Sequence, residues 1–201
     1  MTKVYIYDIT NCSYTIDEIK DKLRYQKIKS RNKYSKEEDL RRSYIAYLLL
    51  QKYLKDDFNI TDSTLEFDLY QKPYIKNIYF NITHSNNIIG VIISNKLCGI
   101  DIEYIDYHKN YDLLAKKILS TEEYNIYISL DKIIDKNIYF IKCFTQKEAY
   151  LKAVGTGIIL SMLKEKIDDI TSINIKDDNS SSYVLSIYKE EDFTIKKDCK
   201  L

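Results

Sequence analysis

Two carboxylates stand two residues apart in an otherwise apolar segment, Gly99–Glu103. On a β-strand the side chains alternate in direction, so Asp101 and Glu103 would share one face while Ile100 and Ile102 share the other. Neighbouring negative charges repel each other, and burial would disfavour both ionised groups. A hard divalent cation with oxygen ligands would offset that cost. The spacing alone leaves two interpretations open, a cation site and a strand whose acidic face is simply solvated, and by itself it favours the solvated strand.

A second group of charges lies in the segment Phe144–Gly157, which reads Phe-Thr-Gln-Lys-Glu-Ala-Tyr-Leu-Lys-Ala-Val-Gly-Thr-Gly. On a helix of 100° per residue, Lys147 and Glu148 fall within or beside the stripe that should be buried. Charges on a buried face need partners, and a metal ion with phosphate groups would provide them. A long lysine stem can carry its ammonium group to water, so Glu148 is the stronger indication of a site.

Two weaker signals favour anion binding. His84 follows an apolar segment and precedes Ser85, and hydroxyl neighbours in a loop would suit an anion, although a lone histidine is more often structural. The segment Lys20–Lys33 is basic and is followed by Arg41 and Arg42. These cations would form either a solvated helix face or a patch that binds phosphate.

Hydrophobic periodicity predicts the elements that would position these groups. The expected strands are Lys3–Ile9, Leu65–Leu69, Ile78–Thr83, Ile88–Ser94, Cys98–Ile105, Ser172–Lys176, Tyr183–Tyr188 and Phe193–Lys196. The expected helical segments are Thr15–Lys29, Ser35 to beyond Leu54, Tyr111–Leu130 and Ile138–Val154. Capping boxes, in which a Ser or Thr precedes a Glu by three residues, are predicted at Thr15/Glu18, Ser35/Glu38 and Ser120/Glu123.

The order strand, helix, helix and three strands therefore occurs twice. It predicts an α+β fold made of two similar halves, residues 1–97 and 98–201. A cleft between such halves is a common place for a ligand. The two halves share no obvious residue identity, so this expectation rests on the order of elements alone.

Composition excludes several classes of protein. The 201 residues include 31 basic and 30 acidic side chains, and a net charge of +1 argues against general nucleic-acid binding. No apolar run approaches the roughly 20 residues of a membrane helix, and Met1–Asn11 alternates polar and apolar residues, unlike a cleavable leader. Four cysteines without Cys-x-x-Cys spacing indicate thiols in a reducing cytoplasm rather than a zinc site. They are Cys12, Cys98, Cys143 and Cys199.

Together these residues resemble the 4′-phosphopantetheinyl transferases of the surfactin-synthetase-activating type. Three segments match that family's patterns in order: Phe80–Ser85 matches Phe-Asn-x-Ser-His-Ser, Gly99–Glu103 matches Gly-Ile/Val-Asp-Ile/Val-Glu, and Phe144–Gly157 matches Trp/Phe-x-x-Lys-Glu-Ala-x-x-Lys-x-x-Gly-x-Gly. The second pattern is weak by itself, the third is specific, and the matched region runs from about Ser35. The resemblance implies a pseudodimer of two α+β halves in one chain, with the active site in the cleft between them.

The resemblance also implies an activity. The chain would transfer the 4′-phosphopantetheine group of coenzyme A to a serine of an acyl, peptidyl or aryl carrier protein and release 3′,5′-ADP. It would use Mg²⁺, with Mn²⁺ as a substitute, held by Asp101, Glu103 and Glu148. Lys147 and Lys152 would stabilise the growing negative charge, and Glu148 is also the candidate base for the serine proton.

The positions that the resemblance assigns to coenzyme A are Lys27, Arg42, Ser43, Lys72, Thr83, His84, Asp101, Lys147 and Lys152. Gln71, Thr83 and Phe144 replace the family's usual glycine, serine and tryptophan. These replacements concern substrate preference more than activity. We expect a cytoplasmic monomer with no nucleic-acid or membrane partner, because two halves in one chain already supply the paired interface.

Two other functions would use similar residues. One is a metal-dependent hydrolase of a nucleotide pyrophosphate, and the other is a non-catalytic module that binds coenzyme A or a carrier protein. Of the three functions, only the transferase adds one phosphopantetheine group to an apo carrier protein.

Overall fold

A computed structural model describes residues 1–25, 36–61, 64–69, 72–156, 164–165, 167, 170–197 and 201. Its strands are β1 (Thr2–Asp8), β2 (Glu66–Phe67), β3 (Pro73–Tyr74), β4 (Tyr79–Ser85), β5 (Ile88–Ser94), β6 (Cys98–Tyr104), β7 (Ile170–Lys176), β8 (Ser182–Lys189) and β9 (Phe193–Lys196). Its helices are α1 (Ile16–Lys22), α3 (Glu37–Phe58), α4 (Asp112–Ile118), α5 (Thr121–Ser129) and α6 (Ile133–Val154). The predicted mixed α+β class is confirmed.

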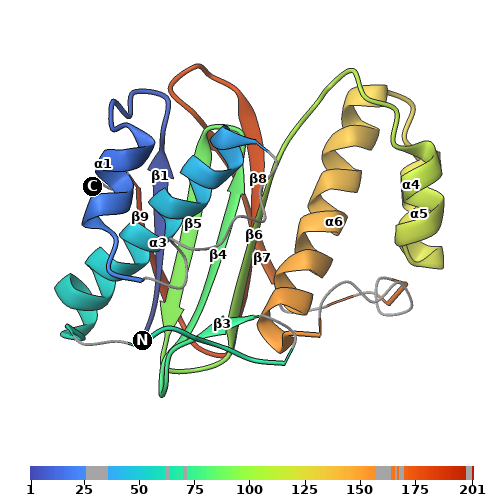
Figure 1. The fold of residues 1–201 in the computed structure, drawn as a ribbon. Coiled ribbons are helices and arrows are strands. Elements are labelled where there is room, and N and C mark those ends of the chain that lie inside the picture. The colour runs from blue at the N-terminus through green and yellow to red at the C-terminus, as the bar shows by residue number, and fades with distance from the viewer. Residues whose placement is uncertain are drawn as a thin grey trace.

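Two sheets form the centre of the molecule, with strand orders β4-β5-β1-β9 and β6-β8-β7. Helices α1 and α3 lie on one side of these sheets, and α6 lies on the other with α4 and α5 outside it (Figure 1). The short pair β2–β3 is separate from both sheets. None of the described helices combines the length and the apolar character that crossing a membrane requires.

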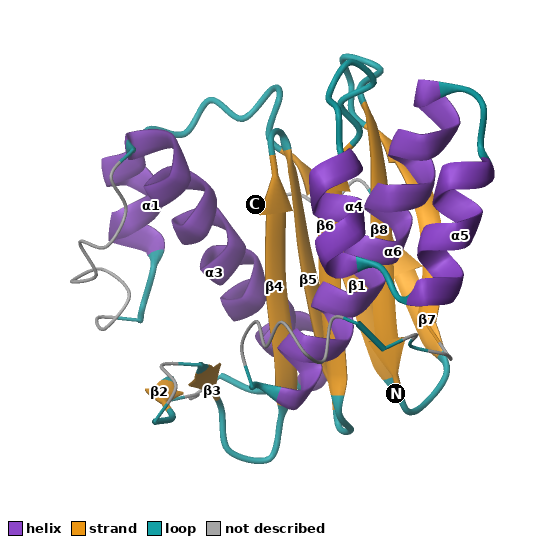
Figure 2. Cartoon of the chain, turned by 90° about the vertical axis from the view of Figure 1, so that its right-hand side faces the viewer, coloured by secondary structure: helices purple, strands orange, loops and turns teal. Residues whose placement is uncertain are grey.

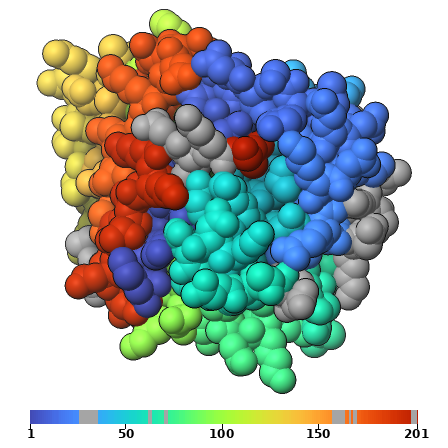
Figure 3. All heavy atoms as spheres, turned by 90° about the vertical axis from the view of Figure 1, so that its left-hand side faces the viewer, coloured from blue at the N-terminus to red at the C-terminus, as the bar shows by residue number. Residues whose placement is uncertain are grey.

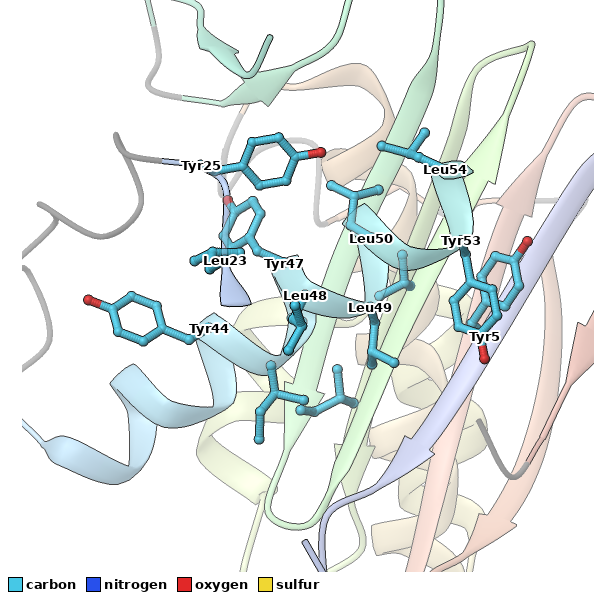
Figure 4. Close-up of a cluster of buried hydrophobic side chains, with 14 of the residues drawn as sticks. Tyr5, Leu23, Tyr25, Tyr44, Tyr47, Leu48, Leu49, Leu50, Tyr53 and Leu54 are labelled. Carbon is cyan, nitrogen blue, oxygen red and sulfur yellow. The ribbon is translucent and has the colours of Figure 1, made fainter. Parts of the chain in front are cut away.

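Apolar side chains fill three layers because successive strand residues face opposite ways. On β1, Tyr5 packs under α3 with the cluster drawn in Figure 4, where its ring stacks on Tyr53 with centroids 3.9 Å apart. Val4 and Ile6 join a second cluster between the two sheets, together with residues of β5, β6 and β8. A third cluster packs α4, α5 and α6 against one another and against Val184 of β8. Every central strand is therefore held from both sides.

Several element ends differ from the sequence prediction. Helix α1 ends at Lys22 rather than Lys29, because Leu23 is extended and buries its side chain in the core. The capping box at Thr15 is present, but α3 has Lys36 as its N-cap residue and no side-chain cap. The predicted cap at Ser35 lies outside the described residues.

The second half also departs from the prediction. The expected helical segment Tyr111–Leu130 forms two short helices, α4 and α5, and the predicted capping box at Ser120 begins the second of them. Helix α6 begins at Ile133 rather than Ile138. Hydrophobic periodicity does not predict the first turn of α6, because its apolar residues do not face the core. Ile133 and Ile134 are 45% and 48% exposed.

Strand β9 belongs to the predicted second half, residues 98–201, but it completes the first sheet. It runs parallel to β1, with Thr2 opposite Phe193 and Tyr5 opposite Lys196. Figure 3 shows red residues from this end of the chain beside the dark blue first residues. The last predicted strand therefore exists, but it pairs across the proposed boundary at residue 97. The division of the chain into two halves stays a prediction.

Candidate active site

Close packing of α6 on β6 begins with Gly99. A Cβ atom at this glycine would overlap the carbonyl oxygen of Ala149 and lie 2.8 Å from the amide nitrogen of Ala153. Only a residue without a side chain allows the helix backbone to approach the strand this closely. The contact brings Glu148 and Lys152 of α6 next to the acidic face of β6, which explains the glycine of the short acidic motif.

Thr83 of β4 connects the edge of the first sheet to β6. Its Oγ1 accepts a hydrogen bond from the backbone N–H of Ile102 at 3.2 Å and donates to Oδ1 of Asp101 at 3.2 Å. Gly90 lies opposite Thr83 on β5, and a Cβ there would be 3.0 Å from the Thr83 methyl group. The glycine therefore makes room for the methyl group of Thr83, whose hydroxyl group reaches β6.

These elements enclose a pocket of about 500 Å³. It contains seven of the predicted site residues: Ser43, Thr83, His84, Asp101, Glu103, Glu148 and Lys152. The remainder of its wall is largely apolar and is formed by Tyr47, Pro73, Phe80, Asn81, Ile82 and Phe144. Strand β4 extends to Ser85 rather than ending at Thr83, so His84 lies on this strand and not in the expected turn.

The three carboxyl groups of the pocket disfavour one another's ionisation. Burial, followed by the charge of Asp101, raises the pKa of Glu103 to about 7. Burial and the charge of Asp101 also raise the pKa of Glu148. Burial raises the pKa of Asp101 itself, against the opposing effect of the Lys152 ammonium group. The pocket therefore has an excess of acidic groups that one lysine does not neutralise.

Lys152 is the cation that faces these carboxyl groups. Its Nζ lies 2.6 Å from Oδ1 of Asp101 and donates to Oγ1 of Thr83 at 3.3 Å. The second oxygen of Asp101, Oδ2, and Oε1 of Glu148 are both buried, and neither has a hydrogen-bond partner within the described part of the chain. Oxygen atoms of this kind are the ligands that Mg²⁺ prefers. Among the described residues, however, no three His, Cys, Asp or Glu side chains are grouped as a metal site.

His84 lines the pocket and lies near the charges of Arg42 and Lys152. Burial lowers the pKa of its imidazole, and the nearby charges of Arg42 and Lys152 lower it further. The ring is therefore largely neutral at pH 7. A bound anion would oppose those two cations and favour the charged imidazole.

Lys147, which the resemblance assigns to phosphate, is not part of this pocket. Its side chain is 1% exposed, its Nζ lies 2.8 Å from Oε2 of Glu123, and it donates to the carbonyl oxygen of Glu165. The helical wheel places Lys147 correctly on a buried face, but the partner on that face is another part of the protein. Its position does not support a contact with phosphate.

Two more predicted coenzyme A positions, Lys72 and Arg42, do not line this pocket. Lys72 donates from Nζ to the last carbonyl groups of α6, those of Lys152 at 2.7 Å and Ala153 at 2.8 Å. Arg42 bonds the carbonyl oxygen of Asn86 and two carboxylates of its own helix, and it lines a neighbouring pocket. Lys27 lies outside the described residues.

Sequence reasoning considered Ser85 only as a hydroxyl neighbour of His84 that would suit an anion, and it gave no role to the apolar wall of the pocket. Ser85 donates to Oε2 of Glu103 at 3.1 Å. The sequence carried a usable signal, because Thr83 and Ser85 share one face of a strand just as Asp101 and Glu103 do. The apolar wall gave no such signal, since its residues come from separate elements.

Comparison with known proteins agrees with this geometry. The family model described as the 4′-phosphopantetheinyl transferase superfamily matches residues 97–198. The 4′-phosphopantetheinyl transferase gsp of Aneurinibacillus migulanus is 30% identical over 165 residues, which cover 80% of this chain and 68% of that protein. A 4′-phosphopantetheinyl transferase of Bacillus subtilis is 27% identical over 176 residues, which cover 83% of this chain and 77% of the relative.

A shorter match is to a relative with a different name. A holo-[acyl-carrier-protein] synthase of Buchnera aphidicola subsp. Acyrthosiphon pisum is 43% identical over 70 residues, which cover 31% of this chain and 52% of that protein. The acidic pair on β6, the glutamate and lysine of α6 and the matches over most of the chain lead to one assignment. The chain belongs to the 4′-phosphopantetheinyl transferase superfamily, and it is a transferase.

Proposed function

We propose that this protein transfers the 4′-phosphopantetheine group of coenzyme A to a serine of an apo carrier protein. The observation that carries the proposal is the pocket in which two buried carboxyl groups, of Asp101 and Glu148, and the half-buried one of Glu103 lie with Lys152 and His84. Acidic groups that suit a cation thus lie beside basic groups that suit phosphate. The named activities of the relatives point in the same direction.

A pair of similar halves is part of this proposal. The strands β1, β4 and β5 lie in the order first, third, second, and β6, β7 and β8 repeat that order. Each first strand precedes a 22-residue helix, α3 in one case and α6 in the other. The pocket draws residues from both halves, as an active-site cleft between them would.

We further propose that Asp101, Glu103 and Glu148 hold Mg²⁺, with Mn²⁺ as a substitute. The fit rests on the chemistry of the donor set and on the two buried oxygens without partners, Oδ2 of Asp101 and Oε1 of Glu148. A divalent ion would neutralise charge on the pyrophosphate of coenzyme A. Lys152, which now neutralises Asp101, would then be free to contact phosphate.

The reaction is a displacement at phosphorus. The serine oxygen of the carrier protein forms a bond to the β-phosphorus of coenzyme A, the bond from that phosphorus to the bridging oxygen breaks, and 3′,5′-ADP leaves. Lys152 stabilises negative charge as it grows on the phosphate oxygens. Glu148, whose pKa is raised by burial, takes the serine proton directly or through water. Ser43, Thr83 and His84 contact the nucleotide end of coenzyme A.

We propose that the protein works as a monomer in the cytoplasm. The three described cysteines, Cys12, Cys98 and Cys143, are free thiols, which suits a reducing compartment. Burial raises the pKa of Cys98 to about 12, so this thiol is unreactive at neutral pH.

The experiment is mass spectrometry of an apo carrier protein incubated with coenzyme A, Mg²⁺ and the wild-type protein. A gain of one phosphopantetheine group is expected, and chelation of the metal should prevent it. Glu148→Gln should reduce the rate by about a hundredfold or more, as loss of a metal ligand and base would. Release of 3′,5′-ADP without modified carrier would instead indicate a hydrolase, and binding without turnover would indicate a non-catalytic module.

A further inference from the structure

The edge strands of the two sheets are joined by side chains. Strands β4 and β6 pack against each other although they belong to different sheets, as Figures 1 and 2 show. The Thr83 hydroxyl group accepts the hydrogen bond that the backbone N–H of Ile102 would otherwise donate to a carbonyl group of a neighbouring strand. It also donates a hydrogen bond to Asp101. Two residues further along, Ser85 repeats this arrangement at the last position of β4.

The Ser85 hydroxyl group has two partners on β6. Its Oγ accepts a hydrogen bond from the backbone N–H of Tyr104 at 3.0 Å and donates to Oε2 of Glu103 at 3.1 Å. A hydroxyl group has a single proton to donate. The hydrogen bond that the Ser85 oxygen accepts from the Tyr104 N–H occupies one side of this oxygen and so restricts the direction in which its own proton can point. The backbone amide of β6 therefore helps to aim that proton at the glutamate.

Glu103 depends on this bond more than Asp101 depends on Thr83. Lys152 bonds Asp101 directly at 2.6 Å, whereas Ser85 is the one described side chain that donates a hydrogen bond to Glu103. A glutamate has three side-chain torsions, so an unsupported Glu103 would populate several rotamers. Supporting partners of this kind orient the groups that bind metal ions and raise affinity.

We infer that Ser85 is a positioning residue that acts through Glu103. From the opposite sheet, it holds the glutamate in the orientation that a cation beside Asp101 requires. This inference rests on the proposed function, because it concerns the same pocket. It also explains why a residue with a hydroxyl group follows His84. The hydrogen bonds of this group join the two sheets at the place where the orientation of Glu103 must be fixed.

The test compares Ser85→Ala with a matched variant, Ser94→Ala. Ser94 Oγ also accepts a backbone N–H, from Lys96 at 3.0 Å, and donates to a glutamate, Oε1 of Glu191, at 3.0 Å. It lies at the far end of β5 and does not line the pocket. Both substitutions remove these two kinds of hydrogen bond and leave a backbone amide without its partner, and Ser94→Ala also removes a hydrogen bond of 2.7 Å with Oγ1 of Thr2.

Mn²⁺ binding to the free protein, followed by electron paramagnetic resonance, gives a readout without coenzyme A or carrier protein. Ser85→Ala should raise the Mn²⁺ dissociation constant about tenfold, while Ser94→Ala should leave it at the wild-type value. Both variants should lower the melting temperature. Equal Mn²⁺ affinity in Ser85→Ala and wild type, or an equal loss in Ser94→Ala, would overturn the inference.

A second pair keeps the test valid if Ser85→Ala does not fold. The threonine and valine side chains have the same shape, and valine has a methyl group where threonine has the hydroxyl group. The Ser85→Thr variant should therefore bind Mn²⁺ more tightly than the Ser85→Val variant. Equal affinity in these two variants also counts against Ser85. A wild type that binds Mn²⁺ but modifies no carrier protein would refute the proposed function while leaving this comparison intact.

Discussion

Two lysines five residues apart on α6 form ion pairs with opposite consequences. Lys147 and its partner Glu123 are 1% and 9% exposed and lie 2.8 Å apart, inside the packing of α5 and α6. Lys152 and its partner Asp101 are 30% and 6% exposed and lie 2.6 Å apart, at the wall of a pocket. The chemical groups are the same in kind, so their surroundings decide what each pair does.

The balance of charge differs as well. Glu123 neutralises Lys147, and the Glu165 carbonyl group takes a further hydrogen bond. Around Lys152, Asp101 is accompanied by Glu103 and Glu148, whose pKa values are raised. The buried pair Lys147–Glu123 has equal and opposite charges and holds α5 and α6 together. The pair Lys152–Asp101 lies at a pocket with two further carboxyl groups, and this excess of acidic groups suits a cationic ligand. Each of the following predictions tests this contrast.

The largest expected effect is on stability, at the enclosed pair. Lys147→Met leaves Glu123 buried without its cation and should lower the free energy of unfolding by about 3–5 kcal/mol. Urea denaturation measures the loss. Transfer activity per folded molecule should stay near the wild-type value, because Lys147 does not line the pocket.

A double variant provides the control for Lys147. Adding Glu123→Gln removes the isolated charge yet keeps the capping box that begins α5, since glutamine can replace glutamate there. The double variant should therefore be more stable than Lys147→Met alone. A folded double variant with a strongly reduced rate would show that Lys147 contacts the substrate after all.

The next effect is on activity, at the open pair. Asp101→Asn keeps the shape of the side chain but removes its charge, so the rate of carrier modification should fall by about a hundredfold or more, beyond the loss typical of a supporting residue. Stability should change little, because Lys152 is 30% exposed and can reach water. Activity is measured by mass spectrometry and stability by urea denaturation. A large loss of stability with normal activity would reverse the contrast between the two pairs.

A smaller effect depends on pH. The pKa of Glu103 is about 7 in the folded protein, above its ordinary value, so the folded state holds a proton that the unfolded chain releases. Stability contributed by this group is therefore present at low pH and is lost as the pH rises through 7. Without metal, Glu103→Gln should match wild type near pH 4, below the ordinary glutamate pKa of 4.5, and exceed it by roughly 2 kcal/mol near pH 8.

Urea denaturation at the two pH values, with a chelator, measures this difference. Added Mg²⁺ should reverse the order at pH 8, because the ion binds the ionised glutamate and not the amide. A difference between the two proteins that does not change with pH would mean that Glu103 titrates normally.

The smallest effect concerns the end of α6 that carries Lys152. Lys72→Met removes two hydrogen bonds to the final carbonyl groups of the helix and should cost about 1 kcal/mol of stability. Because Lys72 lies outside the pocket, the KM for coenzyme A should change little. A large rise in KM with unchanged stability would indicate that Lys72 leaves the helix end to bind phosphate, as the family resemblance implies.

Sequence patterns identified most of the helices and strands and the acidic residues of the site. Strand alternation placed Asp101 and Glu103 on a common face, and helical periodicity placed Lys147 and Glu148 on a buried face. Neither pattern contains information about which residues from other elements complete those faces. The partner of Lys147 lies on α5 and the partner of Lys152 lies on β6, so only the packing separates a structural lysine from one at the pocket.

Long-range pairing was the other unpredictable feature. The apolar alternation of Phe193–Lys196 predicted a strand but could not specify its neighbour, and the strand joined β1 rather than the strands just before it. Likewise, the serine of the His84 motif was assigned to a turn because the strand was expected to stop two residues earlier. Local propensity was correct for Phe193–Lys196 and ended β4 two residues too early, and in both cases pairing with another strand decided the outcome.

The parallel pairing of β9 with β1 has a consequence for synthesis. While the ribosome is still translating residues 193–196, the nascent chain already contains β1, β4 and β5 together with all of the described residues that line the pocket. One flank of β1 remains an open hydrogen-bonding edge until then, and such edges promote association between unfinished chains. A chain that ends just after β8 would therefore contain the described pocket residues but leave this edge of β1 open, and we expect it to aggregate more readily than the chain that includes β9.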